Sequence, residues 1–151
     1  MNICDYIKAI EPPINVWGFA RELGISVLEA NLKDGITSVF VISNKKHFGY
    51  RKVIILNKKC KVEKQAFAIA HAISHYLLHC NDNNDFFELY NYDEQSKSEI
   101  EEQADNLALE ILVPKDLFRT YEKILKYDSV KLDCLSKIFA VDRSLIRKRM
   151  M

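Results

Sequence analysis

Hydrophobic and polar positions recur along this chain at spacings that favour helix in most segments and strand in a few. A first helix is predicted between Pro13 and Gly24, because Pro suits the first helical turn and Gly the position just after the last. Three short segments predict strands, at residues 24–32, 36–43 and 52–57. The first third of the chain is therefore expected to form a helix and a small three-stranded sheet.

Two longer helices are predicted in the middle of the chain. Residues 62–80 carry apolar side chains at helical spacing and contain neither Gly nor Pro. A second helix covers residues 98–112 and stops before Pro114, since the residue preceding a proline disfavours helix. Between them, the acidic and aromatic residues 81–98 give no clear pattern and are interpreted as a loop. Such a long connection is usually functional, so we expect it to flank the functional site.

The residue pattern at the end of the chain predicts two further helices, at residues 132–140 and 143–150. Together they form a helix-turn-helix-like pattern. The basic residues of the second are Arg143, Arg147, Lys148 and Arg149. Direct DNA binding is not expected, because two short helices lack a third supporting helix within the tail and basic side chains also suit a helix C-terminus. The tail is expected instead to pack on the rest of the chain or to help dock a partner.

Length and composition place the chain among globular proteins. Its 151 residues suit one domain of ordinary size, and 48% of them are hydrophobic and 28% charged. No apolar run reaches the roughly 18–20 residues of a membrane span, so no membrane partner is expected. Asp5 and Lys8 interrupt the segment where a signal peptide would be apolar, and the four cysteines form no CxxC pair. These features predict a cytoplasmic protein with reduced thiols.

Charge is distributed unevenly although the net charge is only +1. Residues 1–80 hold 11 basic and 6 acidic side chains, a net charge of +5, and residues 119–151 hold 9 and 4, again +5. Residues 81–118 hold 2 basic and 11 acidic side chains, a net charge of −9. This distribution does not fit a nucleic-acid-binding surface over the whole chain. It fits a solvated acidic loop, a metal site or a groove for a basic peptide.

Three histidines of the longest predicted helix are candidate metal ligands. His71 and His75 are four residues apart and share one helix face, so both can point at one ion. His79 lies about 12 Å from His71 along the helix axis, and a packing or helix-end role is expected for it. The next helix carries Glu101 and Asp105, also four residues apart. One carboxylate of this helix would complete a zinc site with three protein ligands, and Asp105 can accept a ligand's free ring N–H.

Two segments and the tail resemble the ImmA/IrrE family of zinc metallopeptidases. FAIAHAISHYLLH is similar to the family's FxxAHELGHYLLH segment, and EEQADNLALEILVP is similar to its ExEANxFAAxLLMP segment. The tail LDCLSKIFAVDRSLIRKRM resembles the family ending LAxxFxVSxxAVxxRL. The resemblance covers roughly residues 13–150. It implies zinc bound by His71, His75 and Glu101, with Asp105 hydrogen-bonded to a ligand.

The same resemblance implies a fold and a function. The fold is α+β, with a mostly helical zincin-like metallopeptidase domain over residues 1–118 and a small three-stranded sheet. A helix-turn-helix-like tail over residues 119–151 packs on it to form a single compact unit. The function is cleavage of a helix-turn-helix transcriptional repressor that controls a mobile element or a stress response. The substrate is expected along a sheet edge, at residues 36–43 or 52–57.

One position departs from the family pattern. Where the family has HExxH, this chain has Ala72 after the first histidine. That Glu takes a proton from the attacking water and delivers it to the leaving amine, which typically contributes about 10²–10⁴-fold to the rate. The chain as given is therefore expected to bind zinc and to be inactive.

Two explanations for Ala72 stay open at this point. A recent or deliberate inactivating change in an active peptidase is favoured by the intact ligands. The alternative is a natural pseudo-peptidase that acts as an antirepressor or antitoxin-like binding protein, in which zinc is structural.

Overall fold

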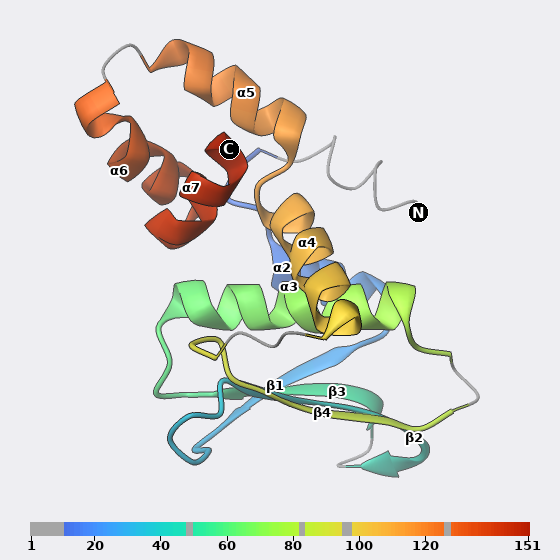
Figure 1. Cartoon of the computed structure of the whole chain (residues 1–151). Coiled ribbons are helices and arrows are strands. Elements are labelled where there is room, and N and C mark those ends of the chain that lie inside the picture. The colour runs from blue at the N-terminus through green and yellow to red at the C-terminus, as the bar shows by residue number, and fades with distance from the viewer. Residues whose placement is uncertain (1–10, 48–49, 82–83, 95–97, 126–127) are drawn as a thin grey trace.

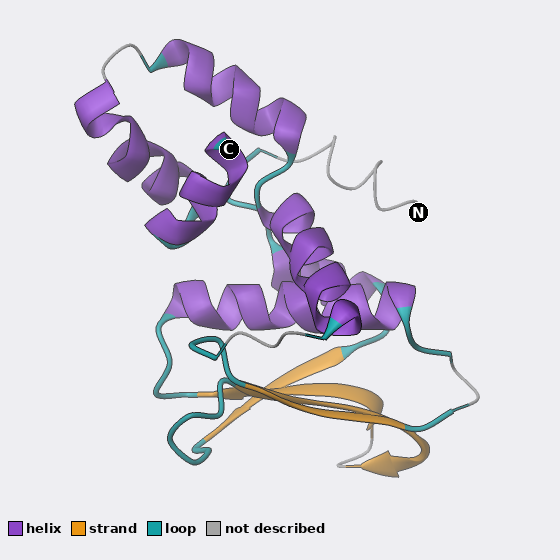
Figure 2. Cartoon of the chain, viewed as in Figure 1, coloured by secondary structure: helices purple, strands orange, loops and turns teal. Residues whose placement is uncertain are grey.

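The structure is a computed structural model that describes residues 11–151 except 48–49, 82–83, 95–97 and 126–127. Its helices are Val16–Glu22 (α2), Val62–Leu78 (α3), Glu99–Leu112 (α4), Lys115–Ile124 (α5), Asp128–Phe139 (α6) and Arg143–Met150 (α7). Its strands are Ser26–Ala30 (β1), Ser38–His47 (β2), Tyr50–Asn57 (β3) and Phe86–Tyr90 (β4). Helix predominates, which confirms the expected α+β, mostly helical fold (Figure 2).

Two further expectations concern the cysteines and N-terminal residues and the absence of a membrane-spanning helix. Cys4, Asp5 and Lys8 lie outside the described residues, and no disulfide joins the described cysteines Cys60, Cys80 and Cys134. Across the described ranges, no helix combines the length and the apolar character needed to cross a membrane.

The sheet has four strands in the order β1-β3-β2-β4, with β1 parallel to β3 and the other pairs antiparallel. The prediction of three strands is wrong, because β4 lies in the segment interpreted as a loop. Strand β4 has only five residues, and a glutamate at one of its inward positions hides the alternation of apolar and polar residues.

Strands β2 and β3 are interior strands of this sheet. The substrate edge expected at residues 36–43 or 52–57 is therefore also wrong. The sheet edges are β1 and β4.

Helix α3 lies across one face of the sheet, and α2 and α4 pack against it (Figure 1). Every residue from Gln65 to His75 is buried, because the sheet and the other helices surround this helix. The alternating alanines Ala66, Ala68, Ala70 and Ala72 leave room for that close approach. Leu77 follows the same apolar periodicity but is exposed, since the last turn extends beyond this cover. The burial of α3 carries its histidines into the protein interior.

The C-terminal helices share the hydrophobic core of the rest of the chain. Leu135, Phe139, Leu145 and Ile146 belong to the same buried cluster as the apolar residues of α3 and α4. The side chain of Arg149 donates to the Val113 carbonyl oxygen at 2.9 Å and pairs with Glu110 at 2.9 Å. These contacts join α7 to the end of α4.

The expectation that the tail lacks a third helix is wrong, because α5 precedes α6 and α7. Phe118 of α5 packs against Phe139 of α6 with ring centroids 6.3 Å apart. The helix-turn-helix-like geometry of α6 and α7, and the division of the chain at residue 118, stay predictions.

We expect the substitution Phe139→Ala to destabilise the whole chain. Phe139 is 1% exposed and packs on Phe118 and Tyr121, and deleting a buried phenylalanine side chain typically costs about 3–5 kcal/mol. Urea denaturation followed by Trp17 fluorescence measures the effect, because Trp17 lies in α2 and not in the tail. The control is Ile124→Ala, at an exposed position of α5. An unchanged Trp17 transition would show that the tail unfolds independently.

Candidate metal centre

The two histidines of α3 present their Nε2 atoms side by side in the protein interior. His71 and His75 are each 1% exposed, and their Nε2 atoms lie 3.1 Å apart. Helix α4 supplies Glu101 from its first turn, which Ser98 caps by accepting the Glu101 N–H. The Glu101 carboxylate oxygens lie 3.1 Å from His71 Nε2 and 2.9 Å from His75 Nε2. The structure thus brings together the three ligands that the sequence analysis predicts.

Hydrogen bonds on the far side of each ring determine which nitrogen faces this group. His71 Nδ1 lies 2.8 Å from Asp105 Oδ1 and donates to it, so the expected partner is in place. His75 Nδ1 is 3.1 Å from His79 Nδ1, and His79 Nε2 is 2.9 Å from Gln103 Oε1. Because the Gln103 oxygen only accepts, His79 donates to it and accepts from His75. In its neutral form each of these two histidines therefore carries its lone pair on Nε2, the form that binds a metal.

His79 has a second role besides ending the helix. Its backbone N–H donates to the His75 carbonyl oxygen, the helix-end position expected for it. Its link from His75 to Gln103 is a contact that the sequence analysis missed. The i, i+4 spacing of His75 and His79 was the available signal.

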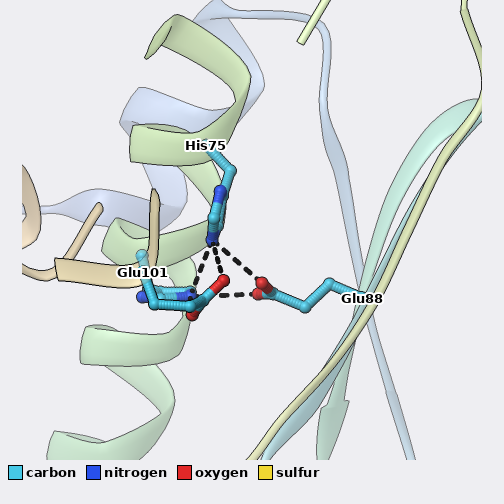
Figure 3. Close-up of side chains that lie close together, drawn as sticks. His75, Glu88 and Glu101 are labelled. Atoms are coloured by element: carbon cyan, nitrogen blue, oxygen red, sulfur yellow. Dashed lines mark hydrogen bonds and ion pairs between the residues drawn. The ribbon is translucent and has the colours of Figure 1, made fainter. Parts of the chain in front are cut away.

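Glu88 of β4 is a further member of this group that the sequence analysis missed. Its carboxylate oxygens lie 3.0 Å from His71 Nε2 and 2.9 Å from His75 Nε2, which matches the contacts of Glu101 from the opposite side (Figure 3). One ligand atom from each of His71, His75, Glu88 and Glu101 fits within 4.8 Å of all the others. The signal in the sequence was the alternation of Phe86, Glu88 and Tyr90. In a strand these three side chains point to the same face, so the carboxylate would lie between two aromatic rings.

The aromatic neighbours of Glu88 in β4 pack on the two histidine rings. The Tyr90 ring stacks on His71 with centroids 4.1 Å apart and an interplanar angle of 22°. The Phe86 ring lies 5.5 Å from the His75 ring. The inward face of β4 therefore covers both imidazoles and places Glu88 between them.

Electrostatics shows that this group suits a cation. Burial opposes ionisation of Glu88, but hydrogen bonds with His71 and His75 outweigh it and hold the pKa of Glu88 well below its usual range. Burial and the neighbouring Glu88 carboxyl raise the pKa of Glu101. Burial disfavours the charged form of His71, yet hydrogen bonds with Asp105 and Glu88 raise its pKa to about 9. Two carboxylates converging on two imidazole nitrogens need positive charge among them, either from protons on the rings or from a metal ion.

The donor set itself fits zinc, which binds imidazole nitrogen and carboxylate oxygen in groups of four. Beside this group lies a pocket of about 570 Å³ between β4 and α4. It is lined by Phe87, Glu88, Leu89, Tyr90, Asn91, Glu94, Glu101 and Asp105, so its charged residues are all acidic. Ala72 supplies no ionisable group to this site, because its side chain is a methyl group. It is 1% exposed and belongs to the hydrophobic core.

Comparison with known proteins identifies relatives of this fold. The peptidase M78 family, described as the IrrE N-terminal-like domain, matches residues 20–151. This match confirms the family expected from the two motifs. No curated protein matches the chain.

The solved structures that are similar include that of a Mycobacterium tuberculosis transcriptional regulator, with a TM-score of 0.56 and 23% sequence identity. The alignment covers 87% of this chain and only 38% of that protein. At 23% sequence identity, this similarity shows that the two proteins share a fold and nothing more.

We expect His79→Ala to weaken zinc binding by about 10–100-fold, the usual cost of removing a hydrogen-bond partner of a metal ligand. Without His79, the His75 ring loses the acceptor that fixes its tautomer and orientation. Competition with a chromophoric chelator measures the zinc affinity. Leu78→Ala, at a neighbouring exposed position of α3, is the control and should bind zinc as the unmodified chain does. Equal affinities in all three proteins would contradict this role.

Proposed function

The chain belongs to the M78 family of peptidases with an IrrE N-terminal-like domain, and from this we propose that it binds zinc and a helix-turn-helix transcriptional repressor without cleaving it. The observation that carries the proposal is a complete set of metal-binding side chains beside a buried Ala72. Binding and catalysis are separable in such a site, because the general base is not a metal ligand.

The zinc ion would be held by His71, His75 and Glu101, with Asp105 and His79 orienting the two rings. When bound, zinc is a Lewis acid that can polarise a peptide carbonyl group. The remaining chemistry of peptide cleavage requires a side chain that accepts and returns a proton.

No carboxylate among the described site residues is free for that proton transfer. Glu88 and Glu101 both contact the two Nε2 atoms, and Asp105 accepts from His71. Loss of the base alone lowers the rate by about 10²–10⁴-fold. The position of Glu88 favours the natural non-catalytic explanation of Ala72, because a single substitution at residue 72 does not bring a carboxylate from β4 into the metal group.

The surface beside the metal group suits a basic, partly apolar segment of the repressor. Strand β4 is an edge of the sheet, and an added strand can pair with such an edge. Phe87 and Leu89 are 65% and 56% exposed on this strand, and the adjoining pocket contains Glu94 and other acidic residues. Proteins that bind DNA carry basic segments, which complement this charge. One of the similar solved structures is that of a transcriptional regulator.

Direct DNA binding by the tail has less support. Arg143 pairs with Asp133 at 2.6 Å, and the largely buried Arg149 pairs with Glu110. Two of the four basic residues of α7 are thus engaged by carboxylates of this chain. We propose that the partner is the repressor protein and not its operator.

The test is incubation with helix-turn-helix repressors, starting with any that is encoded beside the gene for this chain, followed by pull-down and mass spectrometry. We expect the unmodified chain to bind the repressor and to generate no new terminus in the presence of zinc. The variant Ala72→Glu restores the family's base, and we expect it to bind and again not to cleave. Ala72→Gln is the matched control, because it has the size of Glu without its basicity, and circular dichroism shows whether both buried substitutions fold.

Two results would contradict this proposal. Zinc-dependent cleavage by Ala72→Glu and not by Ala72→Gln would show an active peptidase that has lost only its base. Absence of repressor binding by the unmodified, zinc-loaded chain would show that the partner belongs to another class.

We expect Glu94→Lys to weaken repressor binding by about two- to tenfold at low salt, the scale of exposed charge pairs. The reason is that Glu94 lines the pocket beside β4 and carries part of its negative charge. Titration calorimetry at two ionic strengths measures the effect, which should shrink as salt increases. Glu22→Lys, an exposed position on α2, is the control with the same change of charge. An equal effect of both substitutions would show only a general attraction.

A further inference from the structure

The number of side chains at the metal group exceeds what a catalytic site needs. A catalytic zinc site uses three protein ligands and keeps its fourth position for water or substrate, whereas a structural zinc site has four protein ligands. Two histidines and Glu101 already make three. Glu88 is a fourth, and it contacts the same two nitrogen atoms.

We propose that Glu88 is the fourth zinc ligand of this chain and closes the site with a His₂Glu₂ set, so that neither water nor a substrate carbonyl can reach the metal. This inference rests on the zinc binding of the proposed function and adds a reason for inactivity that is independent of Ala72. It concerns the metal alone and does not depend on which partner binds.

The contacts of Glu88 are those of a ligand. Its oxygens lie 3.0 and 2.9 Å from the two Nε2 atoms, and those of Glu101 lie 3.1 and 2.9 Å away. Four atoms bound tetrahedrally at about 2.0–2.1 Å from a zinc ion would lie roughly 3.3 Å from one another. The side chain of Glu88 is 14% exposed and that of Glu101 22% exposed. Glu88 is therefore buried at least as deeply as the ligand that the family motif supplies.

The backbone holds Glu88 in this position. Glu88 is the central residue of β4 and pairs with Phe40 of β2. All five residues of β4 have such a partner in β2. Its neighbours Phe86 and Tyr90 pack on the rings of His75 and His71. The backbone of Glu88 is thus fixed relative to both β2 and α3, in a position from which its side chain reaches the two histidines.

A closed site also ties the edge strand to the helices. His71 and His75 come from α3, Glu101 from α4 and Glu88 from β4, so one ion would join three elements (Figure 3). Zinc binding should therefore protect the backbone amides of β4 from hydrogen exchange, in addition to those of α3 and α4. A site with three ligands would leave β4 outside this protection.

The experiment uses the full chain loaded with cobalt(II), whose visible spectrum reports its ligands, and sodium azide as the probe. We expect azide to leave the spectrum of the unmodified protein unchanged. In Glu88→Ala, which opens one position, azide should shift the spectrum in a saturable manner, and zinc affinity should fall at least about tenfold. Glu94→Ala is the matched control, since it removes one carboxylate from the same pocket without touching the histidines.

The outcomes separate this inference from the proposed function. Saturable binding of azide to the unmodified cobalt protein would overturn the fourth ligand while leaving the metal site intact. Zinc-dependent protection of α3 and α4 without β4 would do the same, and it needs no variant should Glu88→Ala fold poorly. If the unmodified chain holds neither cobalt nor zinc, both the inference and the proposed zinc site are wrong.

Discussion

The burial of α3 between the sheet and the other helices is the constraint on which the site depends. A helix buried from Gln65 to His75 must satisfy every polar group it carries inside the protein, because water does not reach them. The two imidazoles are satisfied from three directions, by Asp105 on α4, by His79 at the end of the same helix, and by Glu88 and Glu101 across the ring edges. The two carboxylates bring negative charge beside the two Nε2 atoms, and a divalent cation that replaces the Nε2 protons would neutralise it.

This arrangement separates two properties that usually occur together in a metallopeptidase site. The ligands and their supporting hydrogen bonds are assembled, while Ala72 removes the proton-transfer group and Glu88 adds a carboxylate to the metal group. Either change alone would impair peptide cleavage. The proposed function accounts for both changes, because an exposed edge strand and an acidic pocket beside the metal group remain for a partner to bind.

The elements that could be predicted from the sequence are those with a long, regular pattern. Helical spacing identified α3 and α4, and the same spacing grouped His71 with His75 and Glu101 with Asp105, which the structure brings together. Strand β4 could not be recognised, because five residues with a charged side chain at an inward position give no clear alternation. Glu88 was missed with it, since only the pairing of β4 with β2 places that carboxylate beside α3. Helix α5 was missed because half of its ten residues are charged, although Phe118 anchors it in the core.

The most direct test of a four-ligand, non-catalytic centre is a crystal structure of the zinc-loaded chain, with anomalous data collected at the zinc absorption edge. Our account predicts one anomalous peak per chain, bonded to His71 Nε2, His75 Nε2 and one oxygen each of Glu88 and Glu101, with no water in the coordination sphere. A zinc ion bound by the two histidines and Glu101, with a water molecule in the fourth position and Glu88 turned away, would contradict it.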